Sequence, residues 1–347
     1  MTATPQPLLG VQTSICFYSP YSGRGNTSGT RVRLEMLARH LSARGIDVHI
    51  VGPFDKIEGA TIHYMSLDVP LPLRPFLSLK ARRMIAALKP KAVVLEGPAF
   101  VFGLRAGKVV QMIHDGKFAT RHRRRGGRFL WFYYFLVCRL CDFTLTVSAA
   151  ERDRIAASLR LKPERLLVSY NGIDDIWLTR PKATGPKQFD LLYVSNFARH
   201  KGHLRLLACL RDKGLRIALV GGDLGTKAET RTYAEAEGLD VTFFSNLSTE
   251  ALIDLYDTAK VFAFPSELEG FGIPFLEARA RGLPVVASNL TVFHELAANL
   301  GGKIVDFDAR EAAAASIFEA LDQPTTRPEL AGFRWSDIAD RLSIQIL

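Results

Sequence analysis

Short apolar runs alternate with amphipathic segments along the whole chain. The apolar runs of the first half cover residues 14–18, 47–51, 92–95, 109–113, 143–147 and 166–169, and those of the second half cover 189–194, 216–220, 241–244, 261–264, 285–287 and 303–305. Between them lie segments with helical periodicity, such as 31–43 and 149–158. A repeated strand-then-helix pattern is typical of βα units that form parallel sheets, so the chain is predicted to be an α/β protein.

The length of the chain indicates two domains. Its 347 residues exceed one typical domain and suit two of about 150–180 residues each. Prolines and a glycine mark residues 176–187 as the linker between them. We therefore expect two Rossmann-like domains, at 1–180 and 181–330, followed by a closing segment at 331–347. Because ligands of such sheets bind at the carboxyl ends of the strands, the site is expected in the cleft between the domains.

Positive charge is concentrated in the first half of the chain. Residues 1–185 hold 28 Lys and Arg against 13 Asp and Glu, whereas residues 186–347 hold 17 against 22. A cationic half favours an acidic partner, which can be a phosphorylated substrate, an anionic lipid surface or a nucleic acid. Charge alone does not decide among the three.

The cysteines and the apolar runs predict a cytoplasmic protein. The chain has four cysteines, Cys16, Cys138, Cys141 and Cys209. They are too few and too scattered for a disulfide framework, and we interpret the closely spaced pair Cys138 and Cys141 as core thiols. The first ten residues lack the pattern of a signal peptide, and the longest apolar run, 129–138, is about half of what spans a bilayer. A peripheral position at the inner face of the plasma membrane stays open.

The most informative stretch runs from residue 264 to 288. Two carboxylates, Glu269 and Glu277, flank a Gly-Phe-Gly turn at 270–272 that leads into a short helix beginning at Pro274. Proline is favoured at the first helical position, where its missing N–H costs nothing. The free N–H groups and positive dipole end of that helix can bind phosphate, and glycines let a ligand touch the backbone. A nucleotide-diphosphate sugar fits this layout, with Glu269 accepting hydrogen bonds from the sugar hydroxyls and Glu277 from the ribose.

Residues 265–278 resemble the Pro-Ser-x-x-Glu-Gly-Phe-Gly-x-Pro-x-x-Glu-Ala segment, with its Glu-x7-Glu motif, of the retaining glycosyltransferase family 4, also called glycosyl transferases group 1. The resemblance extends over nearly the whole chain. It implies the GT-B fold, in which two Rossmann-like domains with parallel sheets face each other across a cleft. It also implies that residues 1–180 bind the acceptor, that 181–330 bind the donor, and that 331–347 form a helix packing towards the first domain.

Further donor-binding residues follow from the resemblance. Lys201 occupies the Lys position of the family's phosphate-binding Gly-Arg-x-x-x-x-Lys-Gly segment, whereas Asn196 stands where the family has Arg. Arg199 is the expected substitute, and the two cations would neutralise the donor diphosphate as charge develops on the leaving group. The expected donor contacts are Gly29, from the glycine-rich stretch 21–30, and Gly270, Phe271, Gly272 and Ile273, while the loop 245–248 is the expected nucleobase site.

His114 directly follows the predicted strand 109–113. The resemblance implies that it faces the donor sugar and helps to position it, without acting as a nucleophile. Together with Glu269 it forms the predicted catalytic set. No metal site and no cofactor beyond the nucleotide-sugar co-substrate are expected. The Asp306-Phe307-Asp308 triplet has metal-ligand spacing, but Arg199 and Lys201 already supply positive charge to the diphosphate.

The resemblance does not account for the basic segment 121–128. Arg121, Arg123, Arg124, Arg125 and Arg128 come directly before an aromatic run. Cations beside aromatic residues suit contact with an anionic membrane surface, and a solvated loop before a buried helix is the alternative. No nucleic-acid-binding motif accompanies the segment, so we expect no nucleic-acid partner.

We therefore predict a retaining, metal-independent glycosyltransferase. It would move a hexose, such as mannose or glucose, from a nucleotide-diphosphate sugar to a lipid-linked or saccharide acceptor during surface polysaccharide biosynthesis. The motifs leave the nucleobase, the sugar, the linkage and the oligomeric state open. The alternatives are a nucleotide-sugar epimerase or hydrolase of similar fold, and a non-catalytic protein that binds membranes or nucleic acid.

Overall fold

The computed structural model of the protein describes residues 13–20, 29–65, 74–99, 101, 103–104, 107–116 and 125–347, without the side chains of 74–77 and 125–127. Contacts within the chain divide it into two compact units. The first unit comprises Met1–Val147, Arg152–Ser169 and Trp335–Leu347, and the second comprises Ser148–Glu151 and Tyr170–Arg334. Each unit is an α/β structure built on one parallel sheet, as the sequence predicts.

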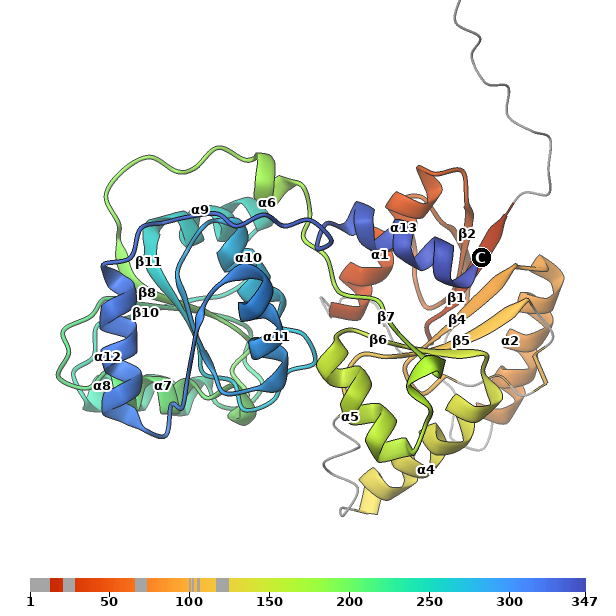
Figure 1. The fold of residues 1–347 in the computed structure, drawn as a ribbon, viewed down its shortest axis with the longest axis horizontal. Coiled ribbons are helices and arrows are strands. Elements are labelled where there is room, and N and C mark those ends of the chain that lie inside the picture. The colour runs from red at the N-terminus through yellow and green to blue at the C-terminus, as the bar shows by residue number, and fades with distance from the viewer. Residues whose placement is uncertain are drawn as a thin grey trace, which may run out of the picture. The chain divides into compact units, whose positions relative to one another are not determined.

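The strands of the first unit are β1 (Ser14–Tyr18), β2 (Asp47–Gly52), β3 (Thr61–Tyr64), β4 (Ala92–Glu96), β5 (Lys108–Ile113), β6 (Phe143–Thr146) and β7 (Leu166–Val168). Its helices are α1 (Gly29–Ser42), α2 (Arg74–Leu88), α4 (Arg125–Leu140), α5 (Ala149–Leu159) and α13 (Trp335–Ile346). The strands form one seven-stranded sheet in the order β3-β2-β1-β4-β5-β6-β7. Within this unit, α1 and α13 lie on one side of the sheet, and α4 and α5 lie on the other (Figure 1).

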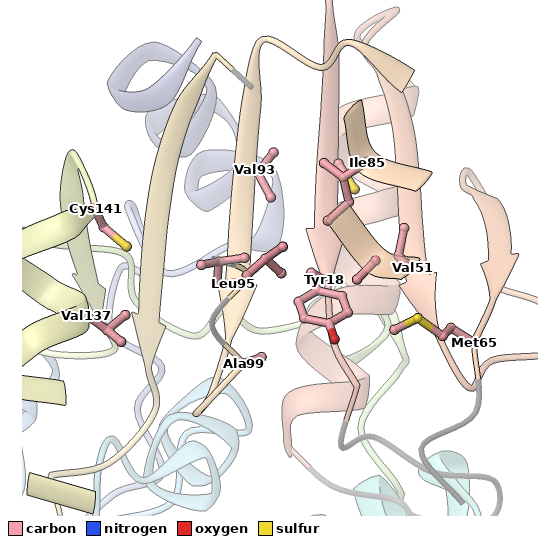
Figure 2. Close-up of a cluster of buried hydrophobic side chains, with 12 residues drawn as sticks. Tyr18, Val51, Met65, Ile85, Val93, Leu95, Ala99, Val137 and Cys141 are labelled. Carbon is pink, nitrogen blue, oxygen red and sulfur yellow. The ribbon is translucent and has the colours of Figure 1, made fainter. Parts of the chain in front are cut away.

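The core of the first unit includes a cluster between the sheet and helices α2 and α4 (Figure 2). Side chains alternate between the two faces of a strand, so Val93 and Leu95 of β4 point to the same side. Tyr18 of β1 packs with them, together with Ile85 from α2 and Val137 from α4. The apolar side chains of two helices thus cover one face of the central strands.

The opposite side of the sheet is closed by α1 and α13. Trp335, Ile338 and Leu342 of α13 are buried. An ion pair joins Arg44 to Asp340, and the guanidinium carbon of Arg33 lies 6.0 Å from the centre of the Trp335 ring. Helix α13, which is the final helix along the chain, therefore completes the unit that the first residues begin.

The strands of the second unit are β8 (Phe189–Val194), β9 (Ile217–Val220), β10 (Val241–Phe244), β11 (Ala259–Phe264), β12 (Val285–Ser288) and β13 (Lys303–Val305). Its helices are α6 (Ile176–Thr179), α7 (His203–Cys209), α8 (Lys227–Ala236), α9 (Thr249–Thr258), α10 (Ile273–Ala280), α11 (Thr291–Leu300) and α12 (Arg310–Leu321), and a 3₁₀ turn covers Arg199–Lys201. The sheet order is β10-β9-β8-β11-β12-β13. The chain winds from β8 to one edge and then returns to build the other half beginning with β11, which is the doubly wound topology.

Each of the predicted strands is present, with ends that agree to within about two residues, which is the usual uncertainty of element boundaries. Strand β3 was not predicted, because Thr61–Tyr64 contains a single aliphatic residue and lies half-exposed at the edge of the sheet. The four cysteines are free and buried, which confirms the interpretation of Cys138 and Cys141 as core thiols. Among the residues described, none of the helices has both the length and the apolar character that spanning a bilayer requires.

Candidate active site

The loops that follow β8 and β11 form the candidate site of the second unit. These strands are neighbours at the centre of the sheet. The chain leaves them towards opposite edges, so their carboxyl ends mark the switch point where ligands of doubly wound sheets bind. The backbone N–H of Glu267 donates to the carbonyl of His200 at 2.9 Å and ties the two loops together. Gly202 has a φ of 71°, and a Cβ there would lie 2.5 Å from the carbonyl oxygen of Pro265, so only glycine allows this approach.

An ion pair also joins the loops. The Lys201 ammonium nitrogen lies 2.6 Å from Oε1 of Glu269, and the two side chains are only 20% and 12% exposed. The fully buried Tyr193 hydroxyl donates to the backbone carbonyl of Lys201 at 2.7 Å and lies 3.1 Å from the Ser266 hydroxyl. An ammonium group has three donors and a carboxylate has two acceptor oxygens. A ligand that carries both an anionic group and hydroxyls can therefore bind to both members of the pair.

The turn at 270–272 leads directly into α10. Gly272 has a φ of 100°, and a Cβ there would lie 2.8 Å from the Phe293 ring. Pro274 lies in the first turn, as predicted, and among the described residues no side chain caps the start of the helix. Uncapped N–H groups at the positive end of a helix dipole are suited to an anion such as phosphate.

Glu277 of α10 is half-buried, and its Oε2 accepts a hydrogen bond from the Tyr256 hydroxyl at 2.9 Å. Burial disfavours the charged carboxylate and raises the pKa of Glu277 from 4.5 to about 7, although the hydrogen bond from Tyr256 opposes this shift. Burial also raises the pKa of Tyr256 well above its ordinary value. The Glu277 carboxyl group is therefore partly protonated near neutral pH.

A second polar cluster lies behind the Gly-Phe-Gly turn. The Ser148 hydroxyl donates to the carbonyl of Gly270 at 3.0 Å and accepts from the N–H of Glu151 at 3.1 Å. The carboxylate of Glu295 accepts hydrogen bonds from the backbone N–H groups of Ala149 and Ala150 at 3.0 and 2.9 Å. These residues were not predicted from the sequence. The Ser148-x-x-Glu151 spacing is that of a capping box, and this pattern in the sequence could have indicated the start of a helix here.

Glu295 also accepts a hydrogen bond from the Tyr170 hydroxyl at 2.8 Å. The Tyr170 ring lies 5.9 Å from the ring of Phe271, centre to centre. Phe271 is therefore held by its aromatic neighbour and is 3% exposed. The side chain of Phe271 therefore supports the turn by packing.

Arg199 begins the 3₁₀ turn and is exposed. It lines a cavity of about 480 Å³ with Arg205 of α7. The Asn196 side chain, which stands where the resemblance expects Arg, accepts a hydrogen bond from the N–H of Gly222 at 3.0 Å. Asn196 thus holds the loop after β9, whereas Arg199 carries the positive charge of this loop together with Lys201.

In the first unit, His114 follows β5 and faces Glu96, the last residue of the neighbouring strand β4. Their side chains lie 2.5 Å apart, between Nε2 of His114 and Oε2 of Glu96. The Glu96 side chain is 2% exposed, whereas that of His114 is 24% exposed. Glu96 was not predicted, although an acid at the end of a buried strand and before Gly97 marks such a position. Arg33 is buried nearby and donates to the Ser169 hydroxyl at 2.6 Å; burial lowers its pKa to about 10, and the charge of Glu96 opposes that shift.

Two family models match consecutive parts of this chain. Residues 27–176 match "Glycosyltransferase Family 4", and residues 176–331 match "Glycosyl transferases group 1". The chain belongs to this glycosyltransferase family. Both models describe the family that the 265–278 motif resembles, so the resemblance is confirmed.

The chain is similar to curated proteins of bacteria. It is 30% identical over 223 residues to the GDP-mannose:cellobiosyl-diphosphopolyprenol alpha-mannosyltransferase of Xanthomonas oryzae pv. oryzae, covering 62% of this chain and 58% of the relative. It is 31% identical over 163 residues to an O-antigen chain mannosyltransferase of Salmonella typhimurium, covering 46% of this chain and 45% of the relative. The chain thus spans about half the length of these curated relatives.

The fold of the chain agrees with solved structures. Sucrose-phosphate synthase from Thermosynechococcus elongatus superposes with a TM-score of 0.79 at 17% identity, over 96% of this chain and 98% of that one. At this identity the likeness concerns the fold, which is of the GT-B class.

The structure pairs two of the predicted donor residues, Lys201 and Glu269, in the second unit. The turn with Ile273 follows Glu269 and leads into α10, which carries Glu277. Gly29 and His114 belong to the first unit. Gly29 begins α1, and nothing lies within 4 Å of a Cβ built there. The rest of the glycine-rich stretch, 21–28, and the first half of the basic segment, 121–124, lie outside the described residues.

The Asp306 and Asp308 carboxylates are both directed to Arg205. The Arg205 guanidinium lies 3.5 Å from Asp306 and 3.1 Å from Asp308. In the part of the chain that the structure describes, no group of three or more His, Cys, Asp and Glu side chains is arranged to hold a metal ion. The charge of the Asp306 and Asp308 carboxylates is thus partly balanced by Arg205.

Proposed function

We propose that this chain is a retaining, metal-independent glycosyltransferase that transfers a hexose from a nucleotide-diphosphate sugar to a lipid-linked or saccharide acceptor in surface polysaccharide biosynthesis. The observation that carries the proposal is the largely buried Lys201–Glu269 ion pair beside the uncapped start of α10. The cation and the free backbone N–H groups suit a diphosphate, and the carboxylate next to them suits the hydroxyls of a sugar attached to it. Family membership supports the reaction class.

Each residue has one proposed role. Lys201 and Arg199 neutralise the diphosphate, and the backbone of Gly270, Phe271, Gly272 and Ile273 donates to its oxygens. Glu269 accepts hydrogen bonds from the sugar hydroxyls, and Glu277 accepts them from the ribose. Gly29 contacts the donor, and His114, oriented by Glu96, positions the sugar.

The proposed reaction uses no nucleophilic side chain. The acceptor hydroxyl oxygen forms a bond to the anomeric carbon on the same face from which the diphosphate leaves, and the bond to the phosphate oxygen breaks. The departing phosphate takes the proton of the hydroxyl. Lys201 stabilises the negative charge that develops on the leaving group. Fixed cations in a partly buried site commonly stabilise a transition state in this way.

The hexose is proposed to be mannose, carried by GDP, because two relatives are named mannosyltransferases and one is named for GDP-mannose. The diphosphopolyprenol in that name supports a lipid-linked acceptor. A cytoplasmic location with contact to an anionic membrane surface suits such an acceptor. The Arg121–Arg128 segment supports this contact by its charge.

The test separates sugar transfer from nucleotide binding. Glu269→Ala is expected to abolish transfer and to leave GDP affinity within about threefold of wild type, because the Lys201 ammonium stays in place for the phosphates. The control is Glu319→Ala, which breaks the exposed Lys303–Glu319 ion pair elsewhere in the same unit. Wild-type turnover in Glu269→Ala would refute the assignment.

Metal independence has its own test. Transfer is expected to survive excess EDTA, because fixed cations lie where a metal would otherwise neutralise the diphosphate. If chelation stops transfer and magnesium or manganese restores it, the reaction is metal-dependent. In that case Asp306 and Asp308 become the first candidates to replace by Asn.

A further inference from the structure

Helix α4 carries apolar side chains on its outward face, where a helix of a water-soluble domain carries polar ones. Phe129 is 75% exposed, Phe132 55%, Leu136 45% and Leu140 63%. At 100° per residue these positions fall within an arc of about 80°. Tyr134, Val137 and Cys138, on a different arc of the helix, are buried against the rest of the unit. The helix is thus apolar on two faces, of which only one is covered by the fold.

An apolar pocket opens beside this outward face. It has a volume of about 1030 Å³ and lies between α4 and α5, with Trp131, Phe132 and Phe135 among its lining residues. Trp131 is held in place because its indole N–H donates to the Ser158 carbonyl and hydroxyl oxygens at 3.1 and 3.2 Å. The volume is at the upper end of the range of about 300–1,000 Å³ that is usual for small-molecule sites.

The charges around the pocket are positive. Arg128 and Arg160 line it, and both are exposed. The sequence of α4 contains three arginines and no acid. A cation near the start of a helix opposes its dipole, so the exposed Arg128 does not stabilise α4 through the dipole. An apolar surface bordered by cations complements an anionic phospholipid, which offers acyl chains beneath a phosphate.

We propose that α4 is an in-plane membrane anchor: Phe129, Phe132, Leu136 and Leu140 enter the acyl region of an anionic phospholipid bilayer, and the pocket between α4 and α5 receives one lipid acyl chain. The 16 residues of α4 extend over about 24 Å, which is too short to cross a hydrocarbon core of about 30 Å. Cationic, aromatic and aliphatic residues on one short helix are the features of interfacial helices.

This inference rests on the proposed contact with an anionic membrane and deepens it. Charge attraction through arginines alone holds a protein at the level of the headgroups and is lost at high salt. Insertion of α4 adds a hydrophobic contribution to the binding free energy, and salt does not screen this contribution. The two cases therefore differ in the salt dependence of binding and in the depth that Trp131 reaches.

The experiment is flotation of the whole chain with vesicles of phosphatidylglycerol and phosphatidylcholine, without donor or acceptor. Wild type is expected to bind at low salt and to stay bound at about 1 M salt, where the screening length falls to about 3 Å. Phe129→Ser with Phe132→Ser is expected to lower partitioning at least tenfold. Ile344→Ser is the matched control, because Ile344 is 82% exposed on α13, on the other side of the sheet.

Tryptophan fluorescence gives a second readout in the same samples. Lipids with a nitroxide label in the acyl chain are expected to quench Trp131, while Trp177 and Trp335 are buried at 5% and 2% exposure and serve as the unquenched background. Trp131→Phe should remove the quenching and keep the binding. Unfolding curves of the serine variants that match wild type will show that the fold is intact.

Several outcomes would overturn the inference. Complete release at high salt without quenching would leave surface charge as the only contact, and the proposed membrane association would stand without insertion. No binding at low salt would refute both. The protein could instead fail to bind vesicles and need Phe129 and Phe132 to form a dimer or to retain a nucleic-acid probe. That result would assign the outward face of α4 to another partner. Sugar transfer does not enter this assay, so the proposed reaction stands or falls separately.

Discussion

The hydroxyl of Tyr256 donates a hydrogen bond to the carboxylate of Glu277 at 2.9 Å, and this bond opposes the burial that raises the pKa of Glu277 to about 7. The pair joins α9 to α10 and controls the charge of the carboxylate proposed to bind ribose.

Nucleotide affinity is expected to rise with pH because of this pair. With a pKa of about 7, the ionised fraction of Glu277 grows about tenfold between pH 6 and pH 8. The dissociation constant of GDP, measured by calorimetry, should fall by a similar factor. Tyr256→Phe removes the hydrogen bond that favours the ionised form, so the rise should shift to higher pH. Glu277→Gln should bind weakly and without this pH dependence; an unchanged profile in that variant would refute the role.

The same shift predicts a pH-dependent stability. Because the pKa of Glu277 is higher in the folded protein than its ordinary 4.5, the folded state holds the proton more tightly. The stabilisation is therefore present below about pH 4.5 and is lost as the pH rises towards about 7, by at most about 3 kcal/mol. Urea unfolding of wild type and Glu277→Gln between pH 5 and pH 8 will measure it. As the pH rises, the unfolding free energy of wild type should fall relative to that of Glu277→Gln.

Tyr193→Phe is expected to loosen the two site loops. The buried Tyr193 hydroxyl donates to the Lys201 carbonyl, and its loss leaves that acceptor without this bond, at a cost of about 1–2 kcal/mol. The Michaelis constant for the donor should rise because Lys201 is held less firmly. Tyr233→Phe, on the half-buried surface of α8, is the matched control. Equal stability and equal kinetics of both variants would show that Tyr193 only fills space.

Glu96→Gln is expected to lower turnover and to spare nucleotide binding. Glu96 meets Nε2 of His114 at 2.5 Å and so fixes the orientation of the imidazole ring. Gln keeps the shape of the side chain but lacks the carboxylate charge, so the ring should be held less firmly and turnover should fall. Glu96→Ala should also cost about 1.5–3 kcal/mol of stability, because it removes a charged hydrogen-bond partner from a buried position. Turnover identical to wild type in Glu96→Gln would contradict the positioning role.

Two similar ion pairs should differ sharply in their effect on stability. Asp257 makes two hydrogen bonds, at 2.9 and 2.6 Å, to the fully buried Arg281, which also donates to the carbonyl of Trp177. Asp257→Ala leaves a buried cation and is expected to cost about 3–5 kcal/mol. Asp254→Ala breaks the exposed pair with Arg180 and should cost at most about 1 kcal/mol. Chemical unfolding of the two variants tests the contrast, and equal losses would contradict it.

Most strands of both sheets could be predicted from the sequence because buried parallel strands appear as continuous apolar runs. The edge strand β3 lacks such a run. The Glu269 to Glu277 stretch was informative because its spacing is local: the turn and the helix bring their residues together within one short segment.

The partners of these residues could not be predicted in the same way. Lys201 and Glu269 are 68 positions apart, and only the adjacency of β8 and β11 joins them. In the sequence nothing distinguishes Tyr256, Glu295 and Glu96 from other helix or strand-end residues. Only the folded structure shows which side chains they contact. The sequence also left α4 ambiguous, because a run that is apolar at almost every position has no period to separate a covered face from an exposed one.

The packing of α13 on α1 has a consequence for the order in which the chain acquires its structure. The first unit needs Trp335–Leu347, whereas the main segment of the second unit, Tyr170–Arg334, is synthesised before that helix exists. At about 5–20 residues per second, ribosomes take about 8–33 s to make this segment. During that interval α1 lacks the cover that Trp335, Ile338 and Leu342 provide. The first unit is therefore the first to be synthesised and the last to complete its fold. Until α13 is made, the apolar surface of α1 is accessible to chaperones.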